Sequence, residues 1–283
     1  MYFLEVNCKF RCAVYSIFCS FTGVKISDSV LYSGIVEAHI LSSGLVLKNA
    51  KIHLPEWVTS IKIDVGLSGN APQSEIWTEH DENLVVFGFE PVSGNRKMIE
   101  TYNSSWPIKL NPIKLRKSVF VIPVALSSNR STNKLKMYIT DDDPGCSSLL
   151  VPIQIQSTNC EYVPVYRLKD FFVFFPFDEF KYIDHLKIDA QGMDFEIIIG
   201  CSEYLKYISY VTAEVDQSYR NSKNSFFLLN IFMFSKGFVK IGKISNLVLK
   251  KLFNHEILVG DPTFFNTRLF YQNRKNIFIY QQN

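Results

Sequence analysis

The stretch Ile61-Lys62-Ile63-Asp64-Val65-Gly66-Leu67-Ser68 decides the fold class of this chain. It belongs to an apolar, β-branched run that ends in a glycine, which is the pattern of a buried strand entering a loop. Pro72 follows shortly afterwards, and proline suits the first turn of a helix because its missing N–H costs nothing there. We therefore predict a strand, a loop and a helix that runs to about His80, with Ser68 or Asn70 as its cap.

The rest of the chain continues this alternation of strands and helices. Further strands are predicted over residues 84–89, 118–124, 135–139, 185–189, 207–215 and 238–241, with one or two more in the tail 255–280 and a polar turn at 129–133. Helices are predicted over residues 93–104, 192–199 and 225–234, and the aromatic stretch 168–180 is expected to pack on the core. Several strands are uninterrupted apolar runs, which indicates an α/β fold with a mainly parallel sheet and helices on both faces.

Composition limits the class of protein. The chain has 283 residues, of which 47% are hydrophobic and 20% are charged, so it can bury a large core. We expect one large domain over residues 57–283, preceded by an N-terminal extension with a helical segment over residues 1–56. The net charge of +3 is too small to indicate a nucleic-acid partner. The six cysteines and five histidines show no zinc-binding spacing, so no metal site is predicted.

The N-terminal segment leaves two interpretations open. Residues 12–24 form an apolar run that follows Lys9 and Arg11, which is similar to the apolar region of a signal peptide. The run is short for a membrane span, which needs about 20 apolar residues. We therefore expect a buried element and a cytoplasmic protein without a stable membrane span, with a signal or membrane anchor as the alternative.

Polar residues at the ends of predicted strands mark a candidate ligand site. In parallel sheets ligands bind outside the carboxyl ends of the strands. Gly66 ends the first predicted strand and allows close approach of the backbone to a ligand. The glycine-rich phosphate fingerprint is absent, which counts against a dinucleotide. Glu90 ends the next strand, where an acidic side chain can accept both hydroxyls of a ribose.

Asp189 is the candidate catalytic residue at another strand end. A carboxylate there can act as a general base or position an acceptor hydroxyl, and it can equally cap the following helix. Lys187 lies two residues earlier and therefore points to the same side of the strand. Glu214 ends a further strand and either lines the same crevice or lies at the surface.

These motifs, in this order, resemble the FkbM family of methyltransferases. The matching segments are residues 63–66, 86–91, 121–127, 186–194 and 211–214. The resemblance implies a Rossmann-like, seven-stranded methyltransferase fold that binds S-adenosylmethionine and methylates a hydroxyl of a sugar or another small molecule.

The resemblance also implies roles for individual residues. Asp64 and Gly66, with Leu67 and Ser68 in the same loop, would shape the methionine and ribose side of the cofactor site. Glu90, followed by Pro91, would take the ribose hydroxyls. The residues expected near the adenine are Ala125 and Leu126.

Two departures from the family pattern keep other functions open. The loop reads Gly66-Leu67-Ser68-Gly69-Asn70 where the family has Asp-x-Gly-Ala-Asn-x-Gly, and Gln191 and Asp194 replace two glutamates. Asp189 remains the best candidate base, with Lys187 or Glu214 nearby. The alternative is a catalytically inactive binding module on the same fold. A nicotinamide-dependent oxidoreductase and a nucleic-acid methyltransferase are less favoured, because their phosphate fingerprint and basic face are missing.

Overall fold

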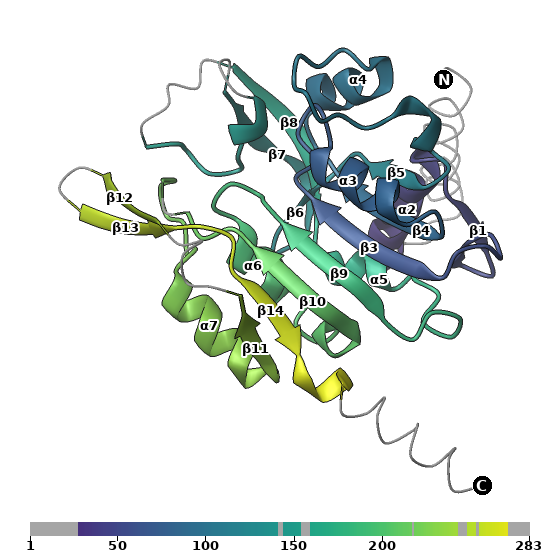
Figure 1. Cartoon of the computed structure of the whole chain (residues 1–283). Helices are drawn as coiled ribbons and strands as arrows, with labels where there is room; N and C mark the ends of the chain where they lie inside the picture. The colour runs from purple at the N-terminus through teal and green to yellow at the C-terminus, as the bar shows by residue number, and fades with distance from the viewer. Residues whose placement is uncertain are drawn as a thin grey trace, which may run out of the picture.

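A seven-stranded sheet forms the centre of the molecule (Figure 1). The computed structural model describes residues 28–140, 144–153, 159–216, 218–242, 248–252 and 255–270. The strands lie in the order β11-β14-β10-β9-β3-β4-β5. Their bounds are β3 Ser60–Val65, β4 Leu84–Phe89, β5 Val119–Ile122, β9 Ile183–Ile188, β10 Ile208–Ala213, β11 Phe238–Ile241 and β14 Thr263–Asn266. All pairs from β10 to β5 are parallel, and only β14 runs antiparallel to its neighbours. The predicted Rossmann-like, mainly parallel sheet is confirmed.

The strand order places a switch point at the middle of the sheet. The chain builds β3, β4 and β5 toward one edge and then returns to place β9 and β10 on the other side of β3. Connections on either side of β3 and β9 therefore lead in opposite directions. Such a point opens a crevice at the carboxyl ends of the two strands, and ligands bind there in open α/β sheets.

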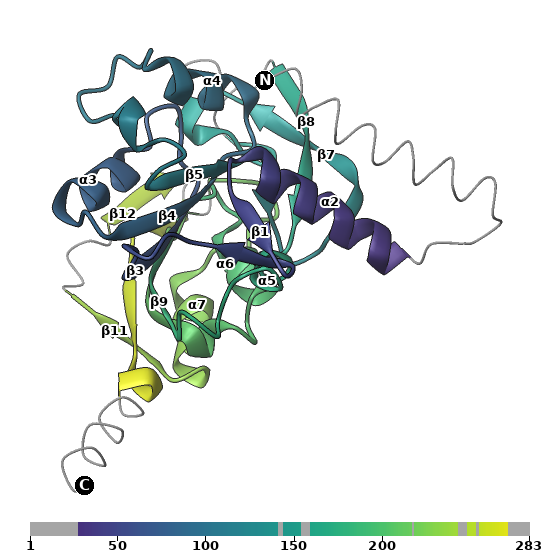
Figure 2. The same ribbon diagram turned by 90° about the vertical axis from the view of Figure 1, so that its right-hand side faces the viewer.

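Helices cover both faces of the sheet. On one face lie α2 Asp28–Ser42, α5 Leu168–Phe172, α6 Asp194–Gly200 and α7 Phe226–Ser235, and on the other lie α3 Pro72–His80 and α4 Ser93–Thr101. Figure 2 shows α2 and α3 on opposite sides of β4. Successive residues of β4 alternate between the two cores, because Phe87 packs with α5 while Val86 packs with α3 and α4. The aromatic stretch around Phe172 is buried in the core, as predicted.

A second, smaller sheet is inserted between β5 and β9, and we call residues 125–166 the insert. Its strands are β6 Ala125–Leu126, β7 Ser131–Ile139 and β8 Asn159–Tyr166, in the order β6-β8-β7. The predicted turn at 129–133 is wrong in its second half, because β7 already begins at Ser131 and pairs there with Val165. Two hairpins complete the strands, β1 Val46–Lys48 with β2 Lys51–His53, and β12 Val248–Leu252 with β13 His255–Val259.

Helix α3 runs from Pro72 to His80 as predicted, but its predicted cap is wrong. The residue before it is Ala71 in a left-handed conformation with a φ of 45°, and no side chain caps the helix. Neither expected cap occupies the position before the helix, which Ala71 takes. The backbone N–H of Ser68 donates to Glu90, and the side chain of Asn70 donates to the carbonyl of Ile108 at 3.0 Å.

None of the helices in the described part of the chain combines the length and apolar character needed to cross a bilayer. The apolar run 12–24 lies outside the described residues. Helix α2, which follows that run, packs into the same core as the sheet through Tyr32, Val36 and Ile40.

Gly66 is required by close packing at the switch point. Its φ is 81°, and a Cβ atom there would lie 1.9 Å from the carbonyl oxygen of Asp189. The backbone N–H of Asp189 donates to the carbonyl of Val65 at 3.0 Å, which holds the two strand ends together. The close approach made by this glycine is therefore between two strand ends of the protein itself.

Replacement of Gly66 by alanine is expected to destabilise the protein by at least about 3 kcal/mol, because the new methyl group must push the ends of β3 and β9 apart. Urea unfolding followed by circular dichroism measures the change. Gly94→Ala in α4 is the matched control, since a Cβ there meets no atom within 4 Å. It should change stability by no more than about 1 kcal/mol. Equal effects of the two substitutions would contradict the packing argument.

A buried ion pair also joins β3 to β9. Asp64 and Lys187 are register partners, and the Lys187 Nζ lies 3.4 Å from Oδ1 of the fully buried Asp64. The same ammonium lies 3.4 Å from Asp189 Oδ2 and donates to the carbonyl of Gly66 at 3.2 Å. Burial lowers the pKa of Lys187, but the carboxylates of Asp64 and Asp189 raise it by more, so its pKa lies above the usual value. Lys187 therefore stays charged beneath the loop.

Lys187→Ala is expected to cost about 3 kcal/mol of stability, because it leaves the buried carboxylate of Asp64 without its cation. Asp64→Asn in the same background should restore part of this loss, with a coupling energy of at least about 1 kcal/mol in urea unfolding. Lys169→Ala is the control, since its pair with Glu203 lies at the surface, and it should cost less than about 1 kcal/mol. Strictly additive losses in the Asp64 and Lys187 cycle would show that the pair contributes nothing.

Candidate functional site

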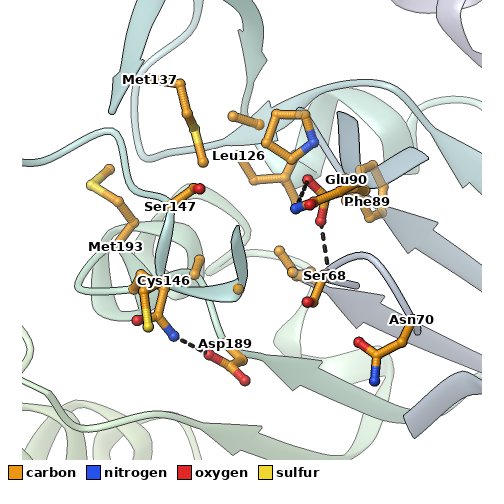
Figure 3. A pocket seen from close by; sticks show the side chains of 18 of the residues that line it. Ser68, Asn70, Phe89, Glu90, Leu126, Met137, Cys146, Ser147, Asp189 and Met193 are labelled. Atoms are coloured by element: carbon orange, nitrogen blue, oxygen red, sulfur yellow. Dashed lines mark hydrogen bonds between the residues drawn. The ribbon is translucent and has the colours of Figure 1, made fainter. Parts of the chain in front are cut away.

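A cavity of about 530 Å³ lies at the carboxyl ends of β3, β4 and β9 (Figure 3). This volume is in the range of sites that hold a small molecule or cofactor. The loops after the three strands supply one side of the cavity, with Ser68 and Glu90 among them, and the insert supplies another side. In Figure 3, Glu90 and Ser68 lie across the cavity from Met137, Cys146 and Met193.

The structure divides the predicted site residues into two groups. Seven line the cavity: Gly66, Ser68, Glu90, Pro91, Ala125, Leu126 and Asp189. Four lie behind its lining: Asp64, Leu67, Lys187 and Glu214. Leu67 is buried in the core beneath α3 and α4. Asp64 and Lys187 form the ion pair under the loop, and Glu214 contacts the site through Gln191.

Glu90 is held rigidly at the end of β4. Its side chain is almost fully buried, with an exposed fraction of 3%. Oε2 accepts a hydrogen bond from the backbone N–H of Ser68 at 2.9 Å, and Oε1 accepts one from that of Val92 at 2.9 Å. Burial raises the pKa of Glu90 to about 7, although these hydrogen bonds and Arg96 oppose the shift. Oε1 also accepts a hydrogen bond from Asn95 Nδ2 at 3.3 Å, so Oε2 is the oxygen that retains acceptor capacity for a ligand hydroxyl.

Asp189 lies at the end of β9 with both carboxylate oxygens engaged. Oδ1 accepts a hydrogen bond from Gln191 Nε2 at 2.7 Å, and Oδ2 faces the Lys187 ammonium at 3.4 Å. The side chain still keeps an exposed fraction of 38%. The capping role considered for Asp189 is wrong, because α6 begins at Asp194 and the residue before it is Met193. Instead, Gln191 and Lys187 fix the orientation of the Asp189 carboxylate, which lines the cavity.

Gln191 connects Asp189 to the neighbouring strand end. The residue has a left-handed backbone with a φ of 52°, and its amide also donates to Glu214 Oε2 at 3.2 Å. The side-chain oxygen Oε1 of Gln191 accepts a hydrogen bond from the Tyr219 hydroxyl at 2.5 Å. Burial raises the pKa of Glu214 to about 10, with the nearby charges of Asp189 and other carboxylates adding to the effect. Glu214 is therefore protonated at neutral pH, behind the lining of the cavity.

Asp194, the second residue that departs from the family pattern, is held by hydrogen bonds within the protein. It is buried, and its Oδ1 accepts hydrogen bonds from the backbone N–H groups of Ala190 and Glu214 at 3.4 and 3.2 Å. Its Oδ2 accepts one from Asn224 Nδ2 at 2.7 Å. Burial, followed by the charge of Asp189, raises the pKa of Asp194 to about 7. This side chain ties the end of β9 to the end of β10.

Several residues that line the cavity were not among the site residues predicted from the sequence. They come from the loop after α4 and from the insert, and include Trp106, Ile108, Met137, Cys146, Ser147 and Leu149. Trp106 is 57% exposed at the cavity, and a large aromatic side chain before a proline in a loop is the signal that would have found it.

Within the described ranges, no group of three His, Cys, Asp or Glu side chains is arranged to hold a metal ion.

Comparison with known proteins identifies the family. No curated protein matches the chain. Among solved structures, the precorrin-6y C5,15-methyltransferase from Geobacter metallireducens GS-15 is 14% identical, with a TM-score of 0.36 over 81% of this chain and 88% of that chain. A TM-score this low does not show that the two proteins share a fold. Residues 73–240 match the methyltransferase FkbM domain. Because this match spans more than half of the chain, the protein belongs to the FkbM family of methyltransferases.

Proposed function

We propose that this methyltransferase uses S-adenosylmethionine to methylate a hydroxyl oxygen of a small molecule, such as a sugar or another hydroxyl compound. The observation that carries the proposal is the buried Glu90 carboxylate, which two backbone N–H groups hold at the cavity. It lies at the carboxyl end of β4, next to the switch point, where an acidic side chain can accept a hydrogen bond from a ribose hydroxyl.

The cavity fits this donor in size and in the chemistry of its lining. Glu90 would hold the ribose, and the loop of Gly66 and Ser68 would flank the methionine part. The apolar lining that contains Pro91, Ala125 and Leu126 suits an adenine ring. When bound, the donor supplies an electrophilic methyl group, so that the protein has chiefly to orient the acceptor.

Asp189 is the residue that we assign to the acceptor hydroxyl. An alcohol is a weak nucleophile, and a carboxylate that accepts its proton or orients it increases the rate. Gln191 and Lys187 each hold one oxygen of Asp189, which fixes the plane of the carboxylate and leaves acceptor capacity on both oxygens. Lys187 and Glu214 act through Asp189, since both lie behind the lining of the cavity.

Calorimetric titration with S-adenosylmethionine tests the donor site. Binding to the wild-type protein is expected to strengthen about tenfold between pH 6 and pH 8, because Glu90, whose pKa is raised to about 7, must lose its proton to accept a ribose hydroxyl. Glu90→Gln should bind at least about tenfold more weakly at pH 8 and should lose this pH dependence.

The control for this titration is Glu161→Gln, which changes a half-buried carboxylate on β8 that accepts from Ser93 outside the cavity lining. It should bind the donor as the wild type does. Failure of the wild-type protein to bind S-adenosylmethionine at any pH would exclude the proposed donor.

Asp189→Asn is expected to keep donor affinity within about threefold and to lower turnover at least about a hundredfold, because it removes the proton acceptor. Transfer of radiolabelled methyl groups to a panel of sugars and other hydroxyl compounds measures turnover. Unchanged turnover would exclude Asp189 from the reaction. Donor binding by the wild type without transfer to any hydroxyl compound would favour the binding module instead.

A further inference from the structure

Helix α7 exposes an apolar face to solvent. Phe227, Leu228, Ile231 and Phe234 are 69%, 46%, 52% and 73% exposed. Their spacing places them along one side of the helix. The opposite side of the helix is buried in the core through Leu229 and Met233, so α7 is already fixed to the sheet. The exposed apolar residues are therefore not needed to pack α7 onto the sheet.

The segment of chain that contains this face carries a net positive charge. Residues 218–242 contain four cations, Arg220, Lys223, Lys236 and Lys240, and no aspartate or glutamate. Lys236 follows the helix, and its amino group lies 5.2 Å from the centre of the Phe232 ring. Lys240 shares a face of β11 with Phe238, which is buried in the core that includes α7. Lys223 precedes the helix and is paired with Glu196 at 2.5 Å.

The shape of the face favours a lipid surface over a second copy of the chain. A ten-residue helix is about 15 Å long, and one side of it is small compared with the roughly 800 Å² per partner of a typical stable interface. A helix with aromatic and aliphatic residues on one side and lysines beside it is typical of elements that lie in a membrane interface. We propose that α7 docks this protein on an anionic lipid surface, with Phe227, Ile231 and Phe234 inserted below the phosphates.

The position of α7 relates the docking surface to the cavity. Asn224, two residues before the helix, donates to Asp194 and to the carbonyl of Glu214 at the carboxyl end of the sheet. The Phe195 ring of α6 contacts Phe232 with ring centroids 5.6 Å apart. The N-terminal end of α7 therefore lies at the end of the sheet that carries the cavity, and the helix runs from there along the sheet (Figure 1).

Co-sedimentation of the full chain with vesicles tests this proposal. The wild type is expected to bind phosphatidylcholine vesicles that contain phosphatidylserine more strongly than pure phosphatidylcholine vesicles. The double variant Phe227→Ser/Phe234→Ser should bind at least about tenfold more weakly to both. Lys236→Glu/Lys240→Glu should lose at least about fivefold per lysine on the anionic vesicles. Ile113→Ser is the matched control, because Ile113 is 75% exposed on the short helix Pro112–Lys114, and it should bind as the wild type does.

Three results would overturn the proposal. The first is absence of wild-type binding to both kinds of vesicle, and the second is undiminished binding of the double phenylalanine variant. The third is light scattering in which that variant converts a dimer into a monomer, since α7 would then be an interface between copies. Circular dichroism melting of each variant, together with sedimentation without vesicles, separates these results from misfolding and aggregation. Vesicle binding is measured without S-adenosylmethionine, so its outcome is independent of the proposed methyl transfer.

Discussion

The contact between the ends of β3 and β9 is the constraint on which the site depends. Gly66 approaches the Asp189 carbonyl so closely that no side chain fits between them, and the Asp189 N–H donates to Val65. This contact brings the loop after β3 beside the loop after β9. The Gly66 N–H also donates to the carbonyl of Phe89, which aligns the loop with the end of β4. Glu90 and Asp189, far apart in the chain, consequently line one cavity.

Electrostatic balance is the second condition at this end of the sheet. Several carboxyl groups gather there, and the ammonium of Lys187 lies between Asp64 and Asp189. Burial raises the pKa values of Glu90, Asp194 and Glu214, so part of the negative charge is absent at neutral pH. Because some of these carboxyl groups are protonated, the number of buried negative charges is smaller than the number of acidic side chains.

The sequence predicted the sheet well because its strands are continuous apolar runs that both faces bury. It predicted the insert poorly, since β8 contains Pro164 and exposes much of its first half, which lacks the apolar pattern of a central strand. The predicted helix cap was wrong because Ala71 takes the position before the helix, and the side chain of Asn70 donates to Ile108, which is distant in the chain. Local sequence patterns do not contain such partners.

The site residues that the sequence predicted correctly are those at the ends of the parallel strands. Residues at strand ends could be predicted from the rule for parallel sheets, and Glu90 and Asp189 do line the cavity. Lys187 and Glu214 were placed on the correct strands, but their depth below the surface depends on Asp64 and Gln191. The family match begins at residue 73, after the loop of Gly66, so the structure is the source of what is known about that loop.

The insert has a consequence for how this protein can diversify. Glu90 and Asp189 belong to loops that the parallel sheet fixes, whereas Met137 belongs to a separate three-stranded sheet on the other side of the cavity. Mutations in that smaller sheet can reshape one half of the cavity without disturbing the strand packing that positions the other half. Recognition of one ligand can therefore drift over generations while the opposite half of the cavity is conserved.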